Sequence, residues 1–136
     1  YGPRQSPRGE AGVVAIVARR LLAGEPPIIH GDGGQTRDFV YVADVVRANL
    51  LALASEADGA FNVGTGVATS VSDLCVALGR AAGVIPAPVY APARAGEQRR
   101  SCLDASAFGR ATGWRPETPL DAGLQATLRA CSRPPA

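Results

Sequence analysis

The stretch Gly31-Asp32-Gly33-Gly34-Gln35-Thr36-Arg37-Asp38-Phe39-Val40-Tyr41-Val42 is the most informative part of this chain. A glycine-rich turn leads into one arginine and a short apolar run, which we expect to be a strand over residues 39–42. Glycine adopts backbone angles that other residues avoid, so such a turn can bring the chain close to a ligand. Arg37 is therefore placed to hold a phosphate through paired hydrogen bonds. A surface hairpin with a solvated arginine explains the same spacing equally well.

Short apolar runs alternate with helical patterns along the chain, which predicts an α/β fold. We expect helices at about residues 11–23, 44–57, 70–83, 106–112 and 119–131, and extended segments at 28–30, 39–42, 61–63, 88–91 and 100–103. Asp44 is expected to cap the second helix, and Ser70 with Asp73 resembles a capping box for the third. The strands are too short and too few to favour a complete doubly wound sheet.

Composition restricts the class of protein. The chain has 136 residues, of which 46% are hydrophobic and 19% charged, as expected for a packed globule. Its net charge of +2 is scattered, so neither nucleic acid nor a membrane surface is indicated as a partner. No apolar run has the length of a membrane span, and no signal peptide opens the sequence.

The cysteine and lysine content limits the kinds of site and of catalytic mechanism that we expect in this chain. The three cysteines are far apart and form no CxxC pair, which argues against a metal site or a disulfide framework and favours a cytoplasmic protein. We expect Cys75 and Cys131 on the apolar faces of helices, the latter in a buried stripe with Leu120, Leu124 and Leu128. All 14 basic residues are arginine, so no lysine-dependent catalytic pair operates within this chain. The chain does not begin with methionine, and we expect it to be a fragment.

Three further segments are candidate sites. Gly64-Thr65-Gly66 invites a dinucleotide-loop interpretation, but the third glycine of that fingerprint would fall at Thr69, so a structural turn is favoured. His30 closes an apolar strand, either as a structural residue or as a flat face for a nucleobase. Arg94 and Glu97 suit the phosphate and the ribose diol of a nucleotide. A surface ion pair between them is the simpler alternative.

Several motifs together resemble one family. They are Tyr1-Gly2-Pro3-Arg4-Gln5, the run from Gly31 to Asn49, Phe61-Asn62-Val63-Gly64-Thr65-Gly66, Pro92-x-Arg94-x-Gly96-Glu97, Leu103-Asp104-x-Ser106 and Gly113-Trp114-x-Pro116. In this order they are similar to NAD-dependent nucleotide-sugar epimerases and dehydratases, which are extended short-chain dehydrogenases, and above all to the UDP-glucose 4-epimerase type. The resemblance implies that residues 1–136 are the carboxyl-terminal, substrate-binding lobe (junction loop 1–10, lobe 11–132, tail 133–136), without the amino-terminal Rossmann domain.

The resemblance also assigns roles to individual positions. Gly12 and Val13 would meet the uracil end of the substrate, and His30 would lie against the base, where many relatives carry an aromatic residue. Arg37 would hold the diphosphate, with Phe39 lining the same pocket. Arg94 would reach the phosphates, Glu97 would bind the ribose hydroxyls, and Tyr1 would lie near the nicotinamide side of the cleft. No catalytic residue and no metal ligand is expected within this chain.

For the complete relative, the implied reaction is C4 epimerisation of a UDP-sugar by transient oxidation with NAD, which the missing half would bind. The fragment alone is expected to be inactive, and the full-length parent to be a homodimer. Other activities of the family stay open, namely a dTDP-glucose 4,6-dehydratase, a UDP-glucuronate decarboxylase or a reductase. A non-catalytic nucleotide-binding module and a purely structural domain also stay open.

Overall fold

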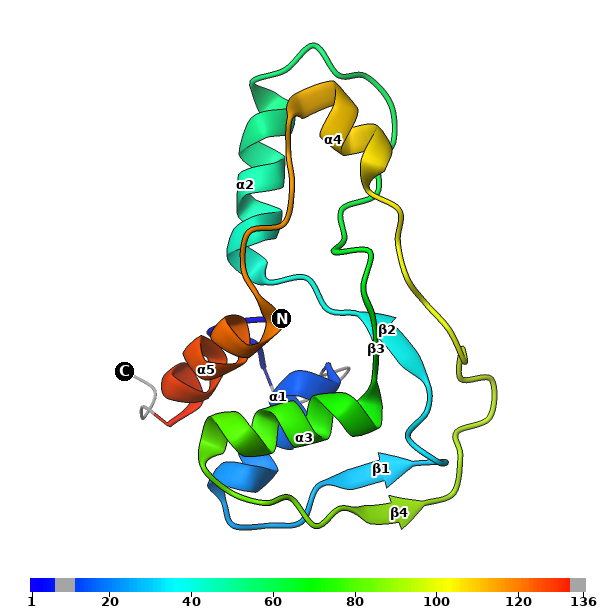
Figure 1. Cartoon of the computed structure of the whole chain (residues 1–136), viewed down its shortest axis with the longest axis vertical. Helices are drawn as coiled ribbons and strands as arrows, with labels where there is room; N and C mark the ends of the chain where they lie inside the picture. The colour runs from blue at the N-terminus through cyan, green and yellow to red at the C-terminus, as the bar shows by residue number, and fades with distance from the viewer. Residues whose placement is uncertain (7–11, 133–136) are drawn as a thin grey trace.

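The computed structural model describes residues 1–6 and 12–132, which form a lower body and an upper arm (Figure 1). The body contains helices α1 (Val13–Leu22), α3 (Val71–Ala82) and α5 (Leu120–Cys131) and strands β1 (Ile28–His30), β2 (Thr36–Asp38), β3 (Ala68–Ser70) and β4 (Val89–Ala91). The arm contains α2 (Val42–Leu53) and α4 (Ser106–Thr112). Short strands alternate with helices, so the predicted α/β class is confirmed. Part of the expected junction loop (7–10) and the expected tail (133–136) lie outside the described residues.

The four strands form two separate pairs. β1 pairs with β4 in parallel, with Ile28 opposite Val89 and His30 opposite Ala91. β2 pairs with β3 antiparallel, with Arg37 opposite Thr69. Each pair joins segments that are distant in sequence, so the loops that follow His30 and Ala91 leave the first pair side by side (Figure 1).

The core of the body lies between α1, α3 and α5. Its buried side chains are mostly small and aliphatic, and the largest that are fully enclosed include Ile29, Leu74, Leu78 and Leu124. Ser70 caps the start of α3, as predicted: its Oγ accepts from the Asp73 amide at 3.0 Å and donates to Asp73 Oδ2 at 2.6 Å. Gly83 ends the same helix in the left-handed conformation, which is common for glycine at this position.

The segment around Asp44 differs from its sequence-based prediction. The expected strand over 39–42 is wrong, because the strand lies at Thr36–Asp38 and α2 already begins at Val42. Asp44 is not the N-cap either; it lies in the first turn and is completely buried. Its carboxylate accepts from the amides of Glu117 at 3.3 Å and Thr118 at 3.0 Å and from Arg47 Nη1 at 2.8 Å. Asp44 therefore ties α2 to the segment that leads into α5.

A second buried cluster joins α2 to α4. Phe108 and Trp114 pack with ring centroids 5.8 Å apart, next to Ala48 of α2. Trp114 Nε1 donates to the Asp44 carbonyl at 3.0 Å, and Gly113 ends α4 in the left-handed conformation. Trp114 therefore packs on this short helix and joins it to α2.

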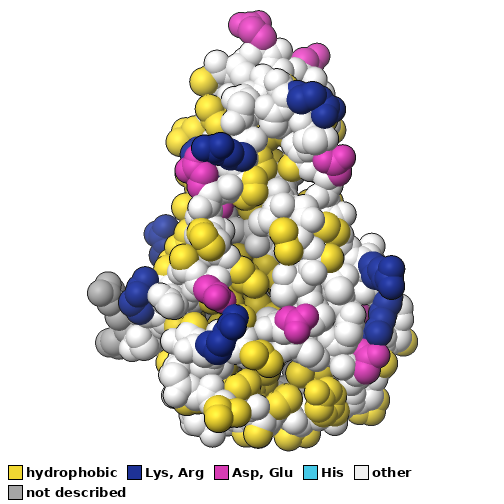
Figure 2. Space-filling view, viewed as in Figure 1, with side chains coloured by type: hydrophobic (Ala, Val, Ile, Leu, Met, Phe, Trp, Pro, Cys, Tyr) yellow, Lys and Arg dark blue, Asp and Glu magenta, His cyan; other side chains and the backbone are white. Residues whose placement is uncertain are grey.

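Other apolar positions are less buried than their spacing suggests. Val46, Leu50 and Leu53 share one side of α2 but are exposed, and Figure 2 shows apolar side chains on that flank of the arm. Cys131, expected in the buried stripe of α5, is also exposed because it occupies the last position of the helix. Residues 61–63 form no strand, since no segment of the described chain pairs with them. No described helix combines the length and apolar character needed to cross a membrane.

Replacing Asp44 by alanine should destabilise the chain by about 2–4 kcal/mol, because two backbone amides and Arg47 lose a buried acceptor. Chemical denaturation followed by the fluorescence of Trp114, the only tryptophan, measures this. Asp121→Ala is the matched control, since Asp121 forms an exposed ion pair with Arg80 and should cost less than about 1 kcal/mol. Equal losses in the two variants would contradict the anchoring role of Asp44.

Stability should also fall in acid through Asp44. Burial acts to raise the pKa of this carboxyl, but the hydrogen bonds from Thr118, Glu117 and Arg47 outweigh it and hold the pKa below its ordinary value. The ionised form therefore stabilises the fold above the ordinary pKa of about 4, and this contribution is lost as pH falls towards the lower folded pKa. Denaturation at a series of pH values below about 5 should show a shallower slope for Asp44→Asn than for the parent.

Candidate binding cavity

A cavity of about 570 Å³ is lined by α1, β1, β2 and the loop after β4. It brings together all the residues that the sequence singled out for substrate binding, from four separate stretches of chain: Gly12, Val13, His30, Arg37, Phe39, Arg94 and Glu97. Tyr1 also lines it. Cavities of this size and mixed polarity are typical small-molecule sites.

The glycine-rich turn that precedes Arg37 is tightly built. Gly31 and Gly33 have φ angles of 68° and 72°, a region that favours glycine. A side chain at Gly33 would collide with Ser72 Oγ and come within 2.9 Å of Ile29 Cγ2. Asp32 accepts from the Gly34 amide at 2.8 Å. The turn is therefore packed directly against α3 and β1 and does not project freely from the surface.

An ion pair closes the outer side of this turn. Arg99 binds both carboxylate oxygens of Asp32, at 2.6 and 2.8 Å. These hydrogen bonds, followed by the one from Gly34, hold the pKa of Asp32 well below its usual range. The Thr36 amide donates to the Arg99 carbonyl at 3.0 Å, so the start of β2 is fixed to the segment after Glu97.

Three contacts hold the guanidinium group of Arg37 in place. Its Nη1 donates to the carbonyls of Thr36 at 2.8 Å and Gln98 at 2.7 Å, and its Nη2 lies 3.6 Å from Glu97 Oε1. The solvated arginine of the hairpin alternative is therefore not what the structure contains. Glu97 pairs with Arg37 rather than with Arg94, so the surface pair considered from the sequence is replaced by a contact between two cavity residues.

Arg94 has a different partner. Its Nη2 lies 3.3 Å from His30 Nε2, and His30 Nδ1 lies 3.1 Å from the carbonyl of Pro92. Both ring nitrogens of His30 are thus engaged by the loop that follows β4. This contact could not be read from the sequence, where the two residues are 64 positions apart.

Further cavity residues carried no strong signal in the sequence. Gln35 is buried and donates to the His30 carbonyl at 3.0 Å, which joins the glycine turn to the end of β1. Arg20 of α1 adds a third guanidinium, held by the Pro26 carbonyl at 2.7 Å and by Glu25 at 3.3 Å. Asp38 follows Arg37 directly in the sequence, which predicted no role for it.

Asp38 explains the glycine turn at residues 64–66. Its carboxylate accepts from the amides of Thr65 and Gly66, each at 2.9 Å, and from Leu103 at 3.3 Å. Partial burial acts to raise the pKa of Asp38, but these bonds and that of the Thr65 hydroxyl outweigh it and lower the pKa. A dinucleotide loop needs such amides for phosphate oxygens. Here they already have an anion, as the structural-turn interpretation requires.

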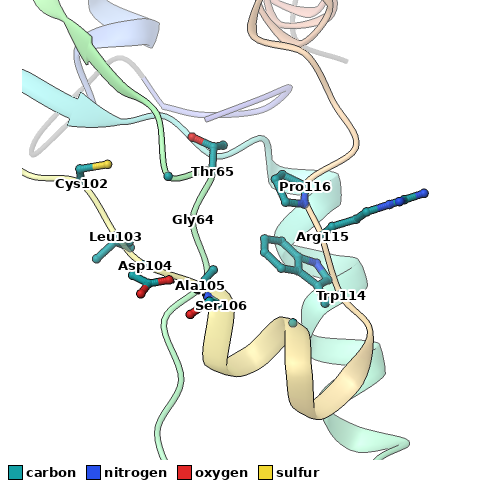
Figure 3. A pocket seen from close by; sticks show the side chains of 12 residues that line it. Gly64, Thr65, Cys102, Leu103, Asp104, Ala105, Ser106, Trp114, Arg115 and Pro116 are labelled. Carbon is teal, nitrogen blue, oxygen red and sulfur yellow. Dashed lines mark hydrogen bonds between the residues drawn. The ribbon is translucent and has the colours of Figure 1, made fainter.

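A second cavity of about 560 Å³ lies between this turn and α4 (Figure 3). Trp114 and Pro116 border one side, and the segment from Cys102 to Ser106 borders the other. None of the residues predicted to bind substrate lines it. Among the described residues, no group of three histidine, cysteine or acidic side chains is arranged to hold a metal ion.

Tyr1 lies at the edge of the first cavity and packs on α5. Its hydroxyl donates to the Leu120 carbonyl at 3.3 Å, and it occupies the space where a side chain at Gly123 would stand. Burial, followed by the charges of Tyr41, Asp44 and Asp121, raises the pKa of Tyr1 to about 12.

Comparison with known proteins gives consistent matches. The model of the NAD dependent epimerase/dehydratase family matches residues 1–64. UDP-glucose 4-epimerase of Mycolicibacterium smegmatis is 47% identical over 129 residues, which is 94% of this chain and 41% of that protein. A putative UDP-glucose 4-epimerase of Methanocaldococcus jannaschii is 44% identical over 125 residues, 92% of this chain and 40% of that protein. A dTDP-glucose 4,6-dehydratase of Actinoplanes sp. is 32% identical over 130 residues, 94% of this chain and 40% of that protein.

Solved structures agree with these matches. UDP-glucose 4-epimerase of Thermotoga maritima, determined with UDP-glucose, has a TM-score of 0.92 at 48% identity and covers 96% of this chain. The Thermus thermophilus UDP-glucose 4-epimerase, in complex with NAD, has a TM-score of 0.88 at 43% identity, again over 96% of this chain. The present chain spans 42% and 43% of those two proteins.

The packing of the glycine turn can be tested with two alanine substitutions. Gly33→Ala should cost about 3 kcal/mol or more, because the left-handed backbone and a collision with α3 both act against it. Gly24→Ala is the control: Gly24 has nearly the same φ, 69°, but open space around it, so only the backbone cost of about 1–2 kcal/mol remains. Urea denaturation of both variants checks this, and equal losses would show that the contact with Ser72 is unimportant.

Proposed function

We propose that the cavity lined by Arg37 and Arg94 binds the nucleotide of a UDP-sugar, since the chain belongs to the NAD dependent epimerase/dehydratase family. It would be the substrate-binding portion of a UDP-glucose 4-epimerase that interconverts C4 epimers. The observation that carries the proposal is that Arg37 of β2 and two residues of the loop after β4, Arg94 and Glu97, line one cavity. Two guanidinium groups and one carboxylate match the charges and the diol of a nucleoside diphosphate.

The contacts of each cavity residue indicate which part of the nucleotide it would bind. Arg37, fixed by two backbone carbonyls, presents a preorganised donor to the diphosphate, with Phe39 beside it. Arg94 adds a second charge, and Glu97 can exchange its 3.6 Å contact with Arg37 for the ribose hydroxyls. Gly12 and Val13, at the start of α1, and the ring of His30 would bound the base. Binding energy from this remote handle helps to place the reacting sugar carbon.

NAD is the cofactor that the family implies, and it supplies the hydride chemistry of such enzymes when bound. The residues of this chain do not fit its pyrophosphate, because the amides of the 64–66 turn are taken by Asp38 and no lysine is available for a Tyr-x-x-x-Lys pair. We place NAD and the catalytic pair on a Rossmann domain outside these 136 residues. The chain alone would then be inactive. The full-length protein would be a homodimer, and Tyr1 would lie near the nicotinamide side of the cleft.

A dehydratase acting on dTDP-glucose is the second candidate, favoured by the similarity to the Actinoplanes enzyme. The full-length protein, supplied with NAD, distinguishes the two. An epimerase forms UDP-galactose from UDP-glucose, whereas a dehydratase releases a 4-keto-6-deoxy sugar from dTDP-glucose. A protein that binds UDP but converts neither substrate would be a non-catalytic nucleotide-binding module.

Calorimetry of UDP with the full-length protein tests the site itself. Arg37→Ala and Arg94→Ala should each weaken binding by about 1–3 kcal/mol, because each removes a charge-assisted hydrogen bond to phosphate. Arg129→Ala, on the exposed side of α5 and away from the cavity, should leave the affinity unchanged. If both cavity variants bind UDP as tightly as the parent, the diphosphate assignment is wrong.

A further inference from the structure

We propose that His30 is a positioning residue: its neutral ring holds Arg94 for the phosphate end of the ligand, in addition to facing the base. This inference rests on the proposed function, because it concerns how the same cavity binds a nucleoside diphosphate. It starts from a contact that the sequence did not indicate, the 3.3 Å approach of Arg94 Nη2 to His30 Nε2.

The two contacts of the imidazole match one neutral tautomer. A guanidinium can only donate, so Nε2 must present a lone pair to Arg94. The Pro92 carbonyl can only accept, so Nδ1 must carry the ring proton and donate to it at 3.1 Å. Both partners demand the same neutral tautomer. The ring therefore joins the Pro92 backbone and the Arg94 side chain without any change of charge.

The backbone beneath the ring is fixed as well. His30 lies at the last position of β1, opposite Ala91 of β4, and the Gly31 amide donates to the Ala91 carbonyl at 2.9 Å. On the other side, the buried Gln35 donates to the His30 carbonyl at 3.0 Å. An imidazole on such a rigid base can restrict a long, exposed arginine side chain, and this lowers the entropy that binding must remove.

Because its partner His30 is neutral in this tautomer, Arg94 keeps more of its positive charge than Arg37 does. Arg37 lies 3.6 Å from the Glu97 carboxylate, so part of its charge is compensated before a ligand arrives. Within residues 1–6 and 12–132, no carboxylate forms an ion pair with Arg94. His30 orients Arg94 without cancelling its charge, which leaves a full positive charge available to a phosphate. A carboxylate at position 30 would orient Arg94 equally well but would compete with the ligand.

A double-mutant cycle on the full-length protein, with UDP as the probe in calorimetry, separates this role from base stacking. His30→Phe keeps a flat ring but removes the acceptor, and we expect it to lower UDP affinity about three- to tenfold. Arg94→Ala should then weaken binding clearly less in the His30→Phe background than in the parent, because the positioned arginine is already lost. Tyr90→Phe, on neighbouring β4 but not lining the cavity, is the control and should bind like the parent.

A conservative variant supplies the second readout. His30→Gln retains a neutral acceptor of similar reach, so Arg94→Ala should cost nearly as much in this background as in the parent. If His30→Gln behaves like His30→Phe, or if His30→Phe binds UDP as tightly as the parent, the positioning role is wrong. Equal costs of Arg94→Ala in the parent and in His30→Phe would also overturn it, while leaving the UDP site intact. If Arg37→Ala and Arg94→Ala are both without effect in the parent, the proposed function itself fails.

Discussion

The short parallel pairing of β1 with β4 is the constraint on which the candidate site depends. It joins residues 28–30 to residues 89–91 and extends through the Gly31 amide, so two loops that are far apart in sequence leave from one place. One loop is the glycine turn that leads into β2 and Arg37, and the other carries Arg94 and Glu97. Neither loop has a core of its own. Their relative position follows from this ladder and from the packing of Ile29 into the body.

The two loops are then joined by side chains at both ends of the cavity. Arg37 reaches the Gln98 carbonyl and Glu97, whereas Arg94 reaches back to His30. Outside the cavity, Arg99 and Asp32 make the same connection. Each of these contacts joins the segment from His30 to Arg37 to the segment that follows β4, so the charged groups brace the cavity from both sides. Such preorganisation is what a site for a flexible, highly charged molecule requires.

Local signals allowed much of the fold to be predicted, and long-range contacts account for the rest. The cap at Ser70 and the bounds of α4 depend on signals within a few residues of the structure they specify, and both were predicted. β2 was missed because Thr36–Asp38 has no apolar pattern; it is a strand only because β3 pairs with it. Asp44 was mistaken for a cap because the amides it binds are more than 70 positions away. The residues of the candidate site were assigned from family motifs. The contacts between these residues could not be predicted, because they join positions that are far apart in the sequence.

Every cation that lines the cavity is an arginine, namely Arg20, Arg37 and Arg94. Guanidinium groups keep their charge throughout the physiological pH range, and they are not substrates for the acylation that neutralises lysine. The positive charge of these three side chains therefore does not vary with cellular acidity or with the acetylation of lysine elsewhere.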